Sequence, residues 1–308
     1  MRLATLRIDG GTRAAVRVDD SFVLLDADDV AGFLRVPGWE QRALDARVSQ
    51  DRRPAATADF APLVTTARKI ICCGLNYFDH IRETGRDVPE YPTLFGKFND
   101  TLTGAYDDIE LPAVSDRVDW EAELAVIVGS TLNNATEEEA ARAIAGYSVA
   151  NDVSMRDWQQ RTVQWMQGKV FTATTPLGPE MVTADEFDPL SPHRITTEVS
   201  GVMAQDSTTD QLVFTSAGLL AYISTFTTLS AGDVVLTGTP ANSRPMQPGD
   251  VVEVEISGIG RLTNTIEEWD VDLAGPGEQM QVSAQTLHVA LAIPEDEAER
   301  MVAEGREP

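Results

Sequence analysis

Two glutamates, Glu121 and Glu123, are separated by one residue in the segment VDWEAELAVIVG (118–129), which otherwise has the composition of a buried strand. Because side chains alternate across a strand, we expect both carboxylates on one face. A third acid, Asp152, lies in the strand-like run YSVANDVS (147–154). Alternating acids most often mark a solvated edge. Here the apolar run beside them favours burial, and the neighbouring sequence offers no matching basic residue to pair with them.

Three carboxylates that converge without cations require a metal ion. Ligation by oxygen alone selects hard divalent cations, so we expect Mg²⁺ or Mn²⁺, with Ca²⁺ as a further candidate. The sequence contains neither an HxxxH nor a CxxC pattern, so zinc is not expected.

A histidine and a glutamate, His80 and Glu83, are three residues apart in the run DHIRETG (79–85). On a helix they would share one face. A carboxylate that accepts a hydrogen bond from one imidazole nitrogen leaves the other nitrogen free to act as a base toward water. Such pairs are also frequent on solvated surfaces, and the spacing alone leaves both interpretations open.

Lysine is rare in this chain: Lys69, Lys97 and Lys169 are its only lysines. Lys97 lies in FGKFN and Lys169 in QGKVF, two runs with little other charge. Lysines are usually exposed. Their apolar surroundings make these two candidates for a functional pocket.

The elements that must position these residues are expected to be mostly strands. Residues 1–26 are predicted to form a small antiparallel meander and 27–50 a helical region, and the polar stretch 49–62 is predicted to link two domains, of residues 1–65 and 66–308. In the second domain we expect strands at 69–77, 118–129, 147–154 and through most of the chain after 180, and helices at 79–85, 136–146, 154–165 and 217–229. The fold class expected is α+β, mostly β, with a mixed β-roll or barrel-like sheet rather than a doubly wound one.

Two helix starts carry capping signals. Thr136 with Glu139 predicts a capping box, and Ser154 is predicted to be the N-cap of the helix at 154–165. The adjacent Cys72 and Cys73 are expected to be reduced thiols in a buried strand, because a disulfide between neighbours is strained.

The charge of the chain limits its partners. Aspartate and glutamate (49) outnumber lysine and arginine (24), which gives a net charge of −25 and argues against nucleic acid or an anionic membrane. A small anionic substrate remains compatible, because a bound cation inverts the local field. The start of the chain has no signal-peptide pattern and no apolar run approaches the roughly 20 residues of a membrane span, so a cytoplasmic location is expected.

The chain resembles the fumarylacetoacetate hydrolase superfamily, in particular its longer bacterial members with a small N-terminal domain. The resemblance covers about two hundred residues from Lys69 onward and leaves out the tail from about residue 271. Each motif is weak alone, but together they follow the order of the family: GLNYFDHIRETG (74–85), DWEAELAVIVG (119–129), GYSVANDVSMRDWQ (146–159), QGKVFTATTPLGP (167–179), VSGVMAQDST (199–208), LSAGDVVLTGTP (229–240) and GDVVEVEISGIGRLTN (249–264).

The resemblance implies roles for specific residues. It implies a metal site formed by Glu121, Glu123 and Asp152, and a catalytic dyad of His80 and Glu83 on a helix within a lid. It also implies a pocket lined by Lys97, Arg156, Gln159 and Lys169, with Thr239 near the substrate carboxylate. It also implies a homodimer.

Two positions depart from the pattern of the family. Some relatives have a threonine where this chain has Ala173, and many continue with glycines where this chain reads ANSRP (241–245). Both lie where the substrate would be held, so the resemblance defines the substrate less well than the chemistry.

The family acts on 2-oxo acids and 1,3-diketones, so we expect a hydrolase of C–C bonds in acylpyruvates, with fumarylpyruvate from aromatic catabolism or sugar-acid diketones as substrates. His80, oriented by Glu83, would deprotonate the attacking water, and Lys169 would offset the charge on the oxyanion. The metal would stabilise the pyruvate enolate that leaves. The alternatives on the same scaffold are decarboxylation of oxaloacetate, keto–enol or double-bond isomerisation of 2-hydroxy-dienedioates, and hydration. A non-catalytic Ca²⁺-binding protein is the alternative from another class.

Overall fold

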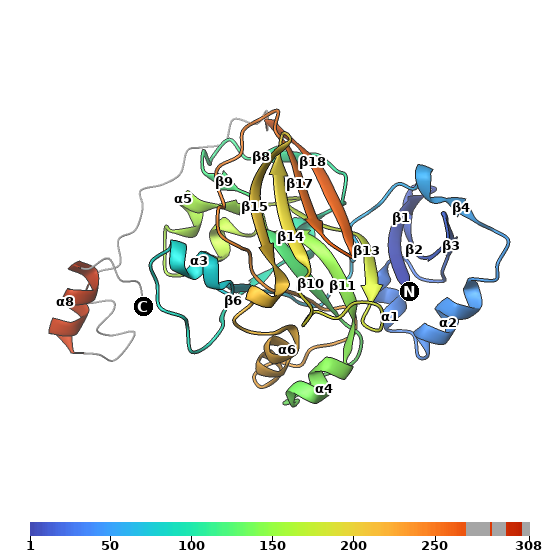
Figure 1. Cartoon of the computed structure of the whole chain (residues 1–308), viewed down its shortest axis with the longest axis horizontal. Coiled ribbons are helices and arrows are strands. Elements are labelled where there is room, and N and C mark those ends of the chain that lie inside the picture. Colours follow the sequence, from blue (N-terminus) through green and yellow to red (C-terminus); the bar gives the residue numbers. More distant parts are fainter. Residues whose placement is uncertain (269–283, 285–293, 304–308) are drawn as a thin grey trace.

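Two open β-sheets pack face to face in the computed structural model, which describes residues 1–268, 284 and 294–303 (Figure 1). The order of the larger sheet is β4 (Arg53–Pro54), β3 (Ser21–Leu24), β2 (Gly11–Val18), β1 (Arg2–Ile8), β13 (Thr175–Thr183), β11 (Ile144–Asn151), β10 (Ala122–Val128), β16 (Val234–Leu236), β5 (Ile70–Gly74) and β6 (Thr93–Lys97), with β7 (Leu102–Thr103) paired to β13. The order of the smaller sheet is β15 (Val202–Thr208), β14 (Arg194–Val199), β17 (Val251–Ile256), β18 (Gly260–Glu268) and β8 (Ile109–Leu111).

The remaining elements are short. A separate ladder pairs β9 (Val118–Asp119) with β12 (Ser154–Met155). The helices are α1 (Val30–Leu34), α2 (Trp39–Ala46), α3 (Phe78–Glu83), α4 (Glu137–Arg142), α5 (Arg156–Gln159), α6 (Ser216–Ser224) and α8 (Glu295–Ala303), with 3₁₀ turns at Ala55–Thr57, Asn99–Thr101, Trp165–Gly168 and Thr209–Gln211. The predicted α+β, mostly β class is confirmed, and the sheets of the described residues are open rather than closed into a barrel.

Strand β10 is the centre of the molecule, and every one of its residues is buried. Leu124 and Val126 face the smaller sheet and pack in one core cluster with residues of β17. Ala125 and Ile127 face the other way and pack in a second cluster with Leu3 of β1. The strand predicted at 118–129 is confirmed for 122–128, whereas Val118–Asp119 belong to the separate β9–β12 ladder. The two-sided burial makes β10 a rigid support for the two glutamates at its start.

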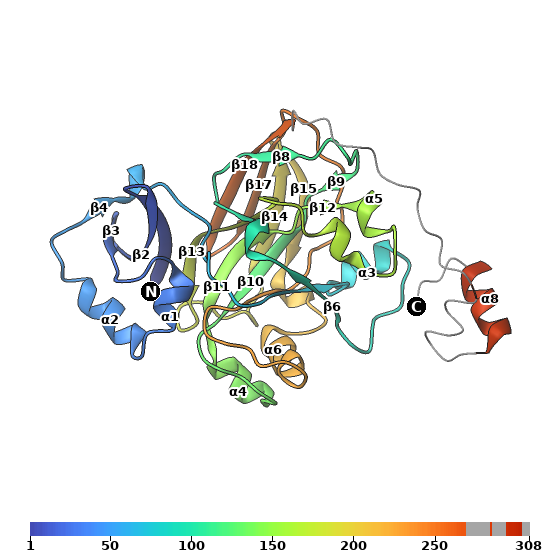
Figure 2. The ribbon, with the colours of Figure 1, turned by 180° about the vertical axis from the view of Figure 1, so that it is seen from behind.

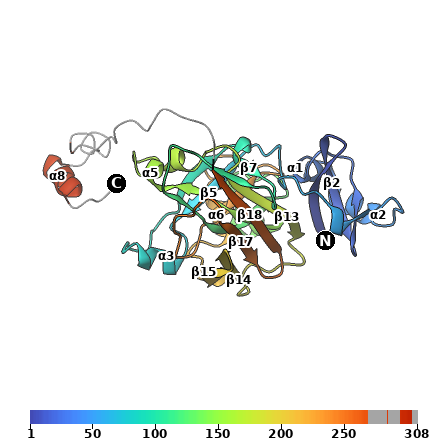
Figure 3. The same cartoon turned by 90° about the horizontal axis from the view of Figure 1, so that it is seen from above.

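The N-terminal strands extend the larger sheet, because β1 pairs antiparallel with β13 through Leu3 and Met181. Figure 2 and Figure 3 show these strands with α2 at one end of the molecule, and α3 and α5 on the opposite side of the sheets. The sheet and one core cluster are thus continuous across the predicted domain boundary at residue 65, which itself stays a prediction.

Local signals in the sequence had mixed outcomes. The capping box is confirmed, since the Thr136 hydroxyl accepts from the Glu139 N–H and the Glu139 carboxylate accepts from the Thr136 N–H. Cys72 and Cys73 are buried free thiols in β5, as predicted. The N-cap at Ser154 was wrong: this residue pairs with Asp119 in the β9–β12 ladder, so α5 begins only at Arg156.

Within the described residues, no helix is long and apolar enough to cross a bilayer. The predicted second domain also includes residues 269–283, 285–293 and 304–308, which lie outside the described residues. The cytoplasmic location stays a prediction.

Candidate active site

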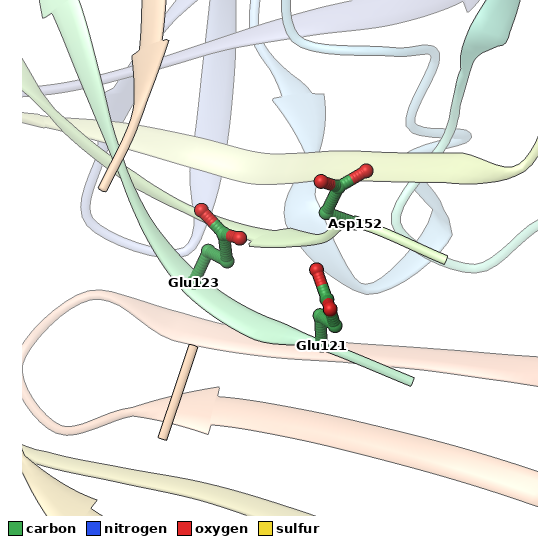
Figure 4. Close-up of side chains that lie close together, drawn as sticks. All are labelled: Glu121, Glu123 and Asp152. Atoms are coloured by element: carbon green, nitrogen blue, oxygen red, sulfur yellow. The ribbon is translucent and has the colours of Figure 1, made fainter. Parts of the chain in front are cut away.

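Three carboxylates meet where β10 begins and β11 ends (Figure 4). The antiparallel register pairs Ala122 with Asn151, and the next N–H along β11, of Asp152, donates to the Glu121 carbonyl at 2.9 Å. Glu121, Glu123 and Asp152 are all buried, and each offers a carboxylate oxygen within 4.8 Å of the others. The fold therefore brings together the three acids that the sequence singled out.

Cations from distant parts of the chain pair with two of these acids. The Lys169 ammonium donates to Glu121 and, at 3.0 Å, to Asp152, while Lys97 donates to Asp152 at 2.6 Å. The Arg156 guanidinium lies 2.7 Å from Glu121. The expectation of carboxylates without basic partners was therefore wrong, because the partners are near in space and not in sequence. We refer to the three acids and the two lysines as the buried cluster: Lys97, Glu121, Glu123, Asp152 and Lys169.

Glu123 differs from its neighbour. It accepts one hydrogen bond, from the Gly238 N–H at 2.6 Å, and has no ion pair among the described residues. Burial raises the pKa of Glu123 well above its usual range, and the nearby charges of Asp152 and Glu121 raise it further. For Glu121, burial also acts to raise the pKa, but Lys169 and Arg156 outweigh it and lower the pKa to about 2.

This contrast tests whether a metal ion fits the site. A buried carboxylate beside two others, without a cation of its own, is costly unless a further positive charge is present. An all-carboxylate donor set matches a hard divalent cation. The residues present therefore fit a divalent ion held by Glu121, Glu123 and Asp152.

Asp119 belongs to the same region and was missed from the sequence. Its carboxylate accepts from the Arg156 Nε at 2.8 Å and from the Ser243 hydroxyl at 3.3 Å. Burial raises the pKa of Asp119, and Arg156 partly offsets this. The signal was available, because Asp119, Glu121 and Glu123 recur at every second position of DWEAE.

The predicted dyad is on α3 and is much more exposed. His80 Nδ1 lies 3.3 Å from a Glu83 carboxylate oxygen. Glu83 also accepts from the Asn242 N–H at 3.1 Å and pairs with Arg244 at 2.9 Å. Burial acts to raise the pKa of Glu83, but these hydrogen bonds, first that of Arg244, lower it below its usual range. We refer to these residues, with a further arginine of the same cavity, as the rim: His80, Glu83, Arg86 and Arg244.

The buried cluster and the rim both contribute residues to the lining of one cavity of about 570 Å³. Most of the site residues predicted from the sequence line it, namely His80, Glu83, Glu121, Glu123, Arg156, Gln159, Lys169 and Thr239. Lys97 and Asp152 are not among its lining residues. Because the Lys97 side chain is 0% exposed and donates to Asp152 and to the Lys169 carbonyl, it supports the buried cluster instead of forming the pocket wall.

The loop at Thr239 is held by the smaller sheet. Gln205, fully buried on β15, donates to the Thr239 hydroxyl at 3.1 Å and to the Pro240 carbonyl at 2.8 Å. The side-chain carbonyl of Gln205 accepts from the Thr197 hydroxyl at 2.7 Å and from the Ala122 N–H at 3.3 Å. Gln205 therefore fixes this loop against the start of β10. It was missed because nothing in the sequence around it indicates the contact.

Several other lining side chains were not predicted either. Ser243 and Arg244 come from the segment ANSRP, and its departure from the pattern of the family was the available signal. Arg86 and Trp165 also line the cavity, and no motif indicated them.

Comparison with known proteins identifies the family. The family described as fumarylacetoacetate (FAA) hydrolase C-terminal matches residues 69–267. The mitochondrial oxaloacetate tautomerase of Rattus norvegicus is 41% identical over 236 residues, which are 73% of this chain and 74% of that protein.

Solved structures agree with this assignment. The 5-carboxymethyl-2-hydroxymuconate delta-isomerase of Mycobacterium smegmatis has a TM-score of 0.74 and 32% identity, over 88% of this chain and 100% of that one. The maleylpyruvate hydrolase of Sphingobium sp. SYK-6, in complex with manganese(II) and pyruvate, has a TM-score of 0.74 and 26% identity, over 87% and 99% of the two chains. The chain belongs to the fumarylacetoacetate hydrolase superfamily.

Proposed function

We propose that the protein is a metal-dependent enzyme that moves a proton at the carbon next to the carbonyl of a 2-oxo acid and so interconverts its keto and enol forms. The observation that carries this proposal is that one cavity is lined both by Glu123, a buried carboxylate that has no ion pair among the described residues, and by an imidazole–carboxylate pair, His80 and Glu83. The similarity to an oxaloacetate tautomerase supports this reaction over others of the superfamily.

The buried cluster would hold Mg²⁺ or Mn²⁺ through Glu121, Glu123 and Asp152. When bound, such an ion supplies Lewis-acid stabilisation of negative charge on the 2-oxo oxygen. Manganese is the ion named for the Sphingobium structure. Lys97 and Lys169 would offset the charges of Asp152 and Glu121 and hold their carboxylates in position.

His80 would be the proton carrier. With its Nδ1 facing Glu83, the Nε2 of the imidazole is the nitrogen left to accept a proton from C3 and to return it to the enolate oxygen. No atom is gained or lost in this step. Arg156, Gln159 and Thr239 line the cavity and would bind the carboxylate of the substrate.

Hydrolysis of an acylpyruvate is the second candidate, because it needs the same residues and the Sphingobium neighbour is named a hydrolase. His80 would then take a proton from a water molecule while the hydroxide formed from that water adds to the acyl carbonyl. Cleavage of the C–C bond would release a carboxylic acid and the enolate of pyruvate, which takes up a proton. Lys169, which lines the cavity, could offset the charge on the oxyanion.

The experiment that separates these reactions is product analysis on two substrates with Mg²⁺ present. Tautomerisation of oxaloacetate changes the enol absorbance without releasing pyruvate, whereas hydrolysis of fumarylpyruvate yields pyruvate and fumarate. Release of CO₂ from oxaloacetate would indicate the decarboxylase alternative. We expect EDTA to abolish the reaction, and activity that survives EDTA would contradict the metal-dependent proposal.

We also propose that the protein is a homodimer, as the resemblance implied, and that it is located in the cytoplasm. Size-exclusion chromatography with light scattering tests the dimer, and a monomer at micromolar concentration would contradict it.

A further inference from the structure

Glu83 is shared between the dyad and the segment that follows the TGTP loop. One of its oxygens accepts from Arg244 at 2.9 Å. The other accepts from the Asn242 N–H at 3.1 Å and lies 3.3 Å from His80 Nδ1. The carboxylate that must orient the imidazole is therefore held more closely by Arg244 than by His80.

The same segment contacts the surroundings of the buried cluster. The Ser243 hydroxyl donates to the Trp120 carbonyl at 2.6 Å and accepts from Arg156 at 2.7 Å. Arg156 in turn pairs with Glu121. Asn242 has a φ of 72°, a left-handed conformation that asparagine tolerates better than most residues. This turn lets the side chains of two adjacent residues point in opposite directions: Ser243 contacts Trp120 and Arg156, and Arg244 contacts Glu83 at the rim.

The rim presents two guanidinium groups to the cavity. The Arg244 side chain is 57% exposed. Arg86 is exposed, and within the part of the chain that the structure describes its side chain takes part in no hydrogen bond or ion pair. In a chain with a net charge of −25, unpaired positive charge beside a cavity favours an anionic group there. A guanidinium fork matches a carboxylate in shape as well as in charge.

We propose that Arg244 selects substrates with a second carboxylate, distal to the 2-oxo group, and that this contact sets the dyad. In the free protein Arg244 holds Glu83. A bound substrate, with its 2-oxo end at the buried cluster, places its distal carboxylate at the rim and takes over the Arg244 guanidinium. Glu83 then remains with His80. This inference rests on the proposed function, and it names Arg244 as the residue that recognises the distal carboxylate of the substrate.

The exchange is physically inexpensive. An ion pair as exposed as that of Glu83 and Arg244 contributes little net free energy, so a second carboxylate can compete for the guanidinium. Arg86, at the same rim, adds attraction for that carboxylate. Arg244 is thus a positioning residue for the dyad and a specificity-determining residue for the substrate.

The test uses two stable binding probes that differ only at the distal end. 2-Oxoglutarate ends in a carboxylate, whereas 2-oxopentanoate ends in a methyl group. Their affinities for the full chain with Mg²⁺ are measured by titration calorimetry for the wild type, Arg244→Met, Arg244→Lys and the control Arg261→Met. Arg261 is a suitable control because it is an exposed arginine that pairs with Glu253 and Glu255, away from the cavity.

We expect Arg244→Met to weaken 2-oxoglutarate binding roughly tenfold to a hundredfold and to change 2-oxopentanoate binding less than about twofold. Arg244→Lys should recover part of the loss, and Arg261→Met should match the wild type. With oxaloacetate, Arg244→Met should raise KM more than it lowers kcat. Equal losses for both probes, or a wild type without preference for 2-oxoglutarate, would overturn the proposal. A wild type that prefers 2-oxoglutarate but catalyses no reaction would support this inference and contradict the proposed function.

Discussion

The buried cluster and the rim contribute to one cavity, but the fold holds them in different ways. In the buried cluster, the side chains of Lys97 and Asp152 are both 0% exposed and lie 2.6 Å apart. At the rim, the side chains of Arg244 and Glu83 are 57% and 30% exposed. The first region is fixed by burial and by charge, and the second is held by contacts that solvent and substrate can replace.

This difference separates two tasks. A metal-binding region must hold like charges close together, which requires rigid neighbours and compensating cations. A region that recognises variable substrates gains from exposed groups on a loop. Changes in the buried cluster should therefore affect stability, whereas changes at the rim should affect rate and selectivity.

The largest effect should come from Lys97→Met. This change leaves the buried Asp152 with one cation fewer, and breaking such a pair costs at least about 3 kcal/mol of unfolding free energy. Chemical denaturation in EDTA measures the loss, with the exposed Arg261→Met expected to cost less than about 1 kcal/mol. Equal stabilities for the two variants would remove the distinction between the regions.

His80→Gln should instead lower the rate and leave the stability of the fold nearly unchanged. Loss of the proton carrier should lower kcat about a hundredfold. The side chain is partly exposed, and within the described part of the chain its side-chain hydrogen bond is the long one to Glu83, so the melting temperature should stay within about 1 °C of the wild type. Steady-state kinetics and calorimetry on the same preparation measure both. Unchanged turnover would exclude His80 from the reaction.

The smallest effect concerns the charge of Glu83. Its folded pKa lies below the unfolded value, so it stabilises the fold above the unfolded pKa, about 4.3, and this contribution is lost as pH falls through the folded pKa. Glu83→Gln should lower the melting temperature by about 1–2 °C at pH 7. The difference should shrink as pH falls below about 4.3 and vanish once the pH is below the folded pKa. A larger difference at low pH would contradict this sign.

The two regions also differ in how far the sequence predicted them. The alternation of Glu121 and Glu123 in an apolar strand, with Asp152 after a second strand, indicated the carboxylates. Their cations were missed because pairing depends on the tertiary fold: Lys169 is 48 residues from Glu121, and Lys97 is 55 residues from Asp152. A sequence pattern predicts which face of a strand a side chain occupies, but it does not predict which residues pack against that face.

At the rim, spacing predicted the contact between His80 and Glu83, because both lie on one short helix. It could not predict Arg244, which is 161 residues from Glu83. The β-rich fold class followed from local composition and from the resemblance. The pairing of β1 with β13, which joins the N-terminal strands to the larger sheet, has no local signal.

The central claim is that three buried carboxylates hold one divalent ion, and a Mn²⁺ titration of the metal-free chain tests it most directly. The wild type and the control Glu255→Gln, on β17 outside the cavity, should each bind one ion tightly. Glu123→Gln should lose that binding while it keeps the fold, since Glu123 has no ion pair to break among the described residues. Wild-type affinity in Glu123→Gln, or no tight binding by the wild type, would contradict the claim.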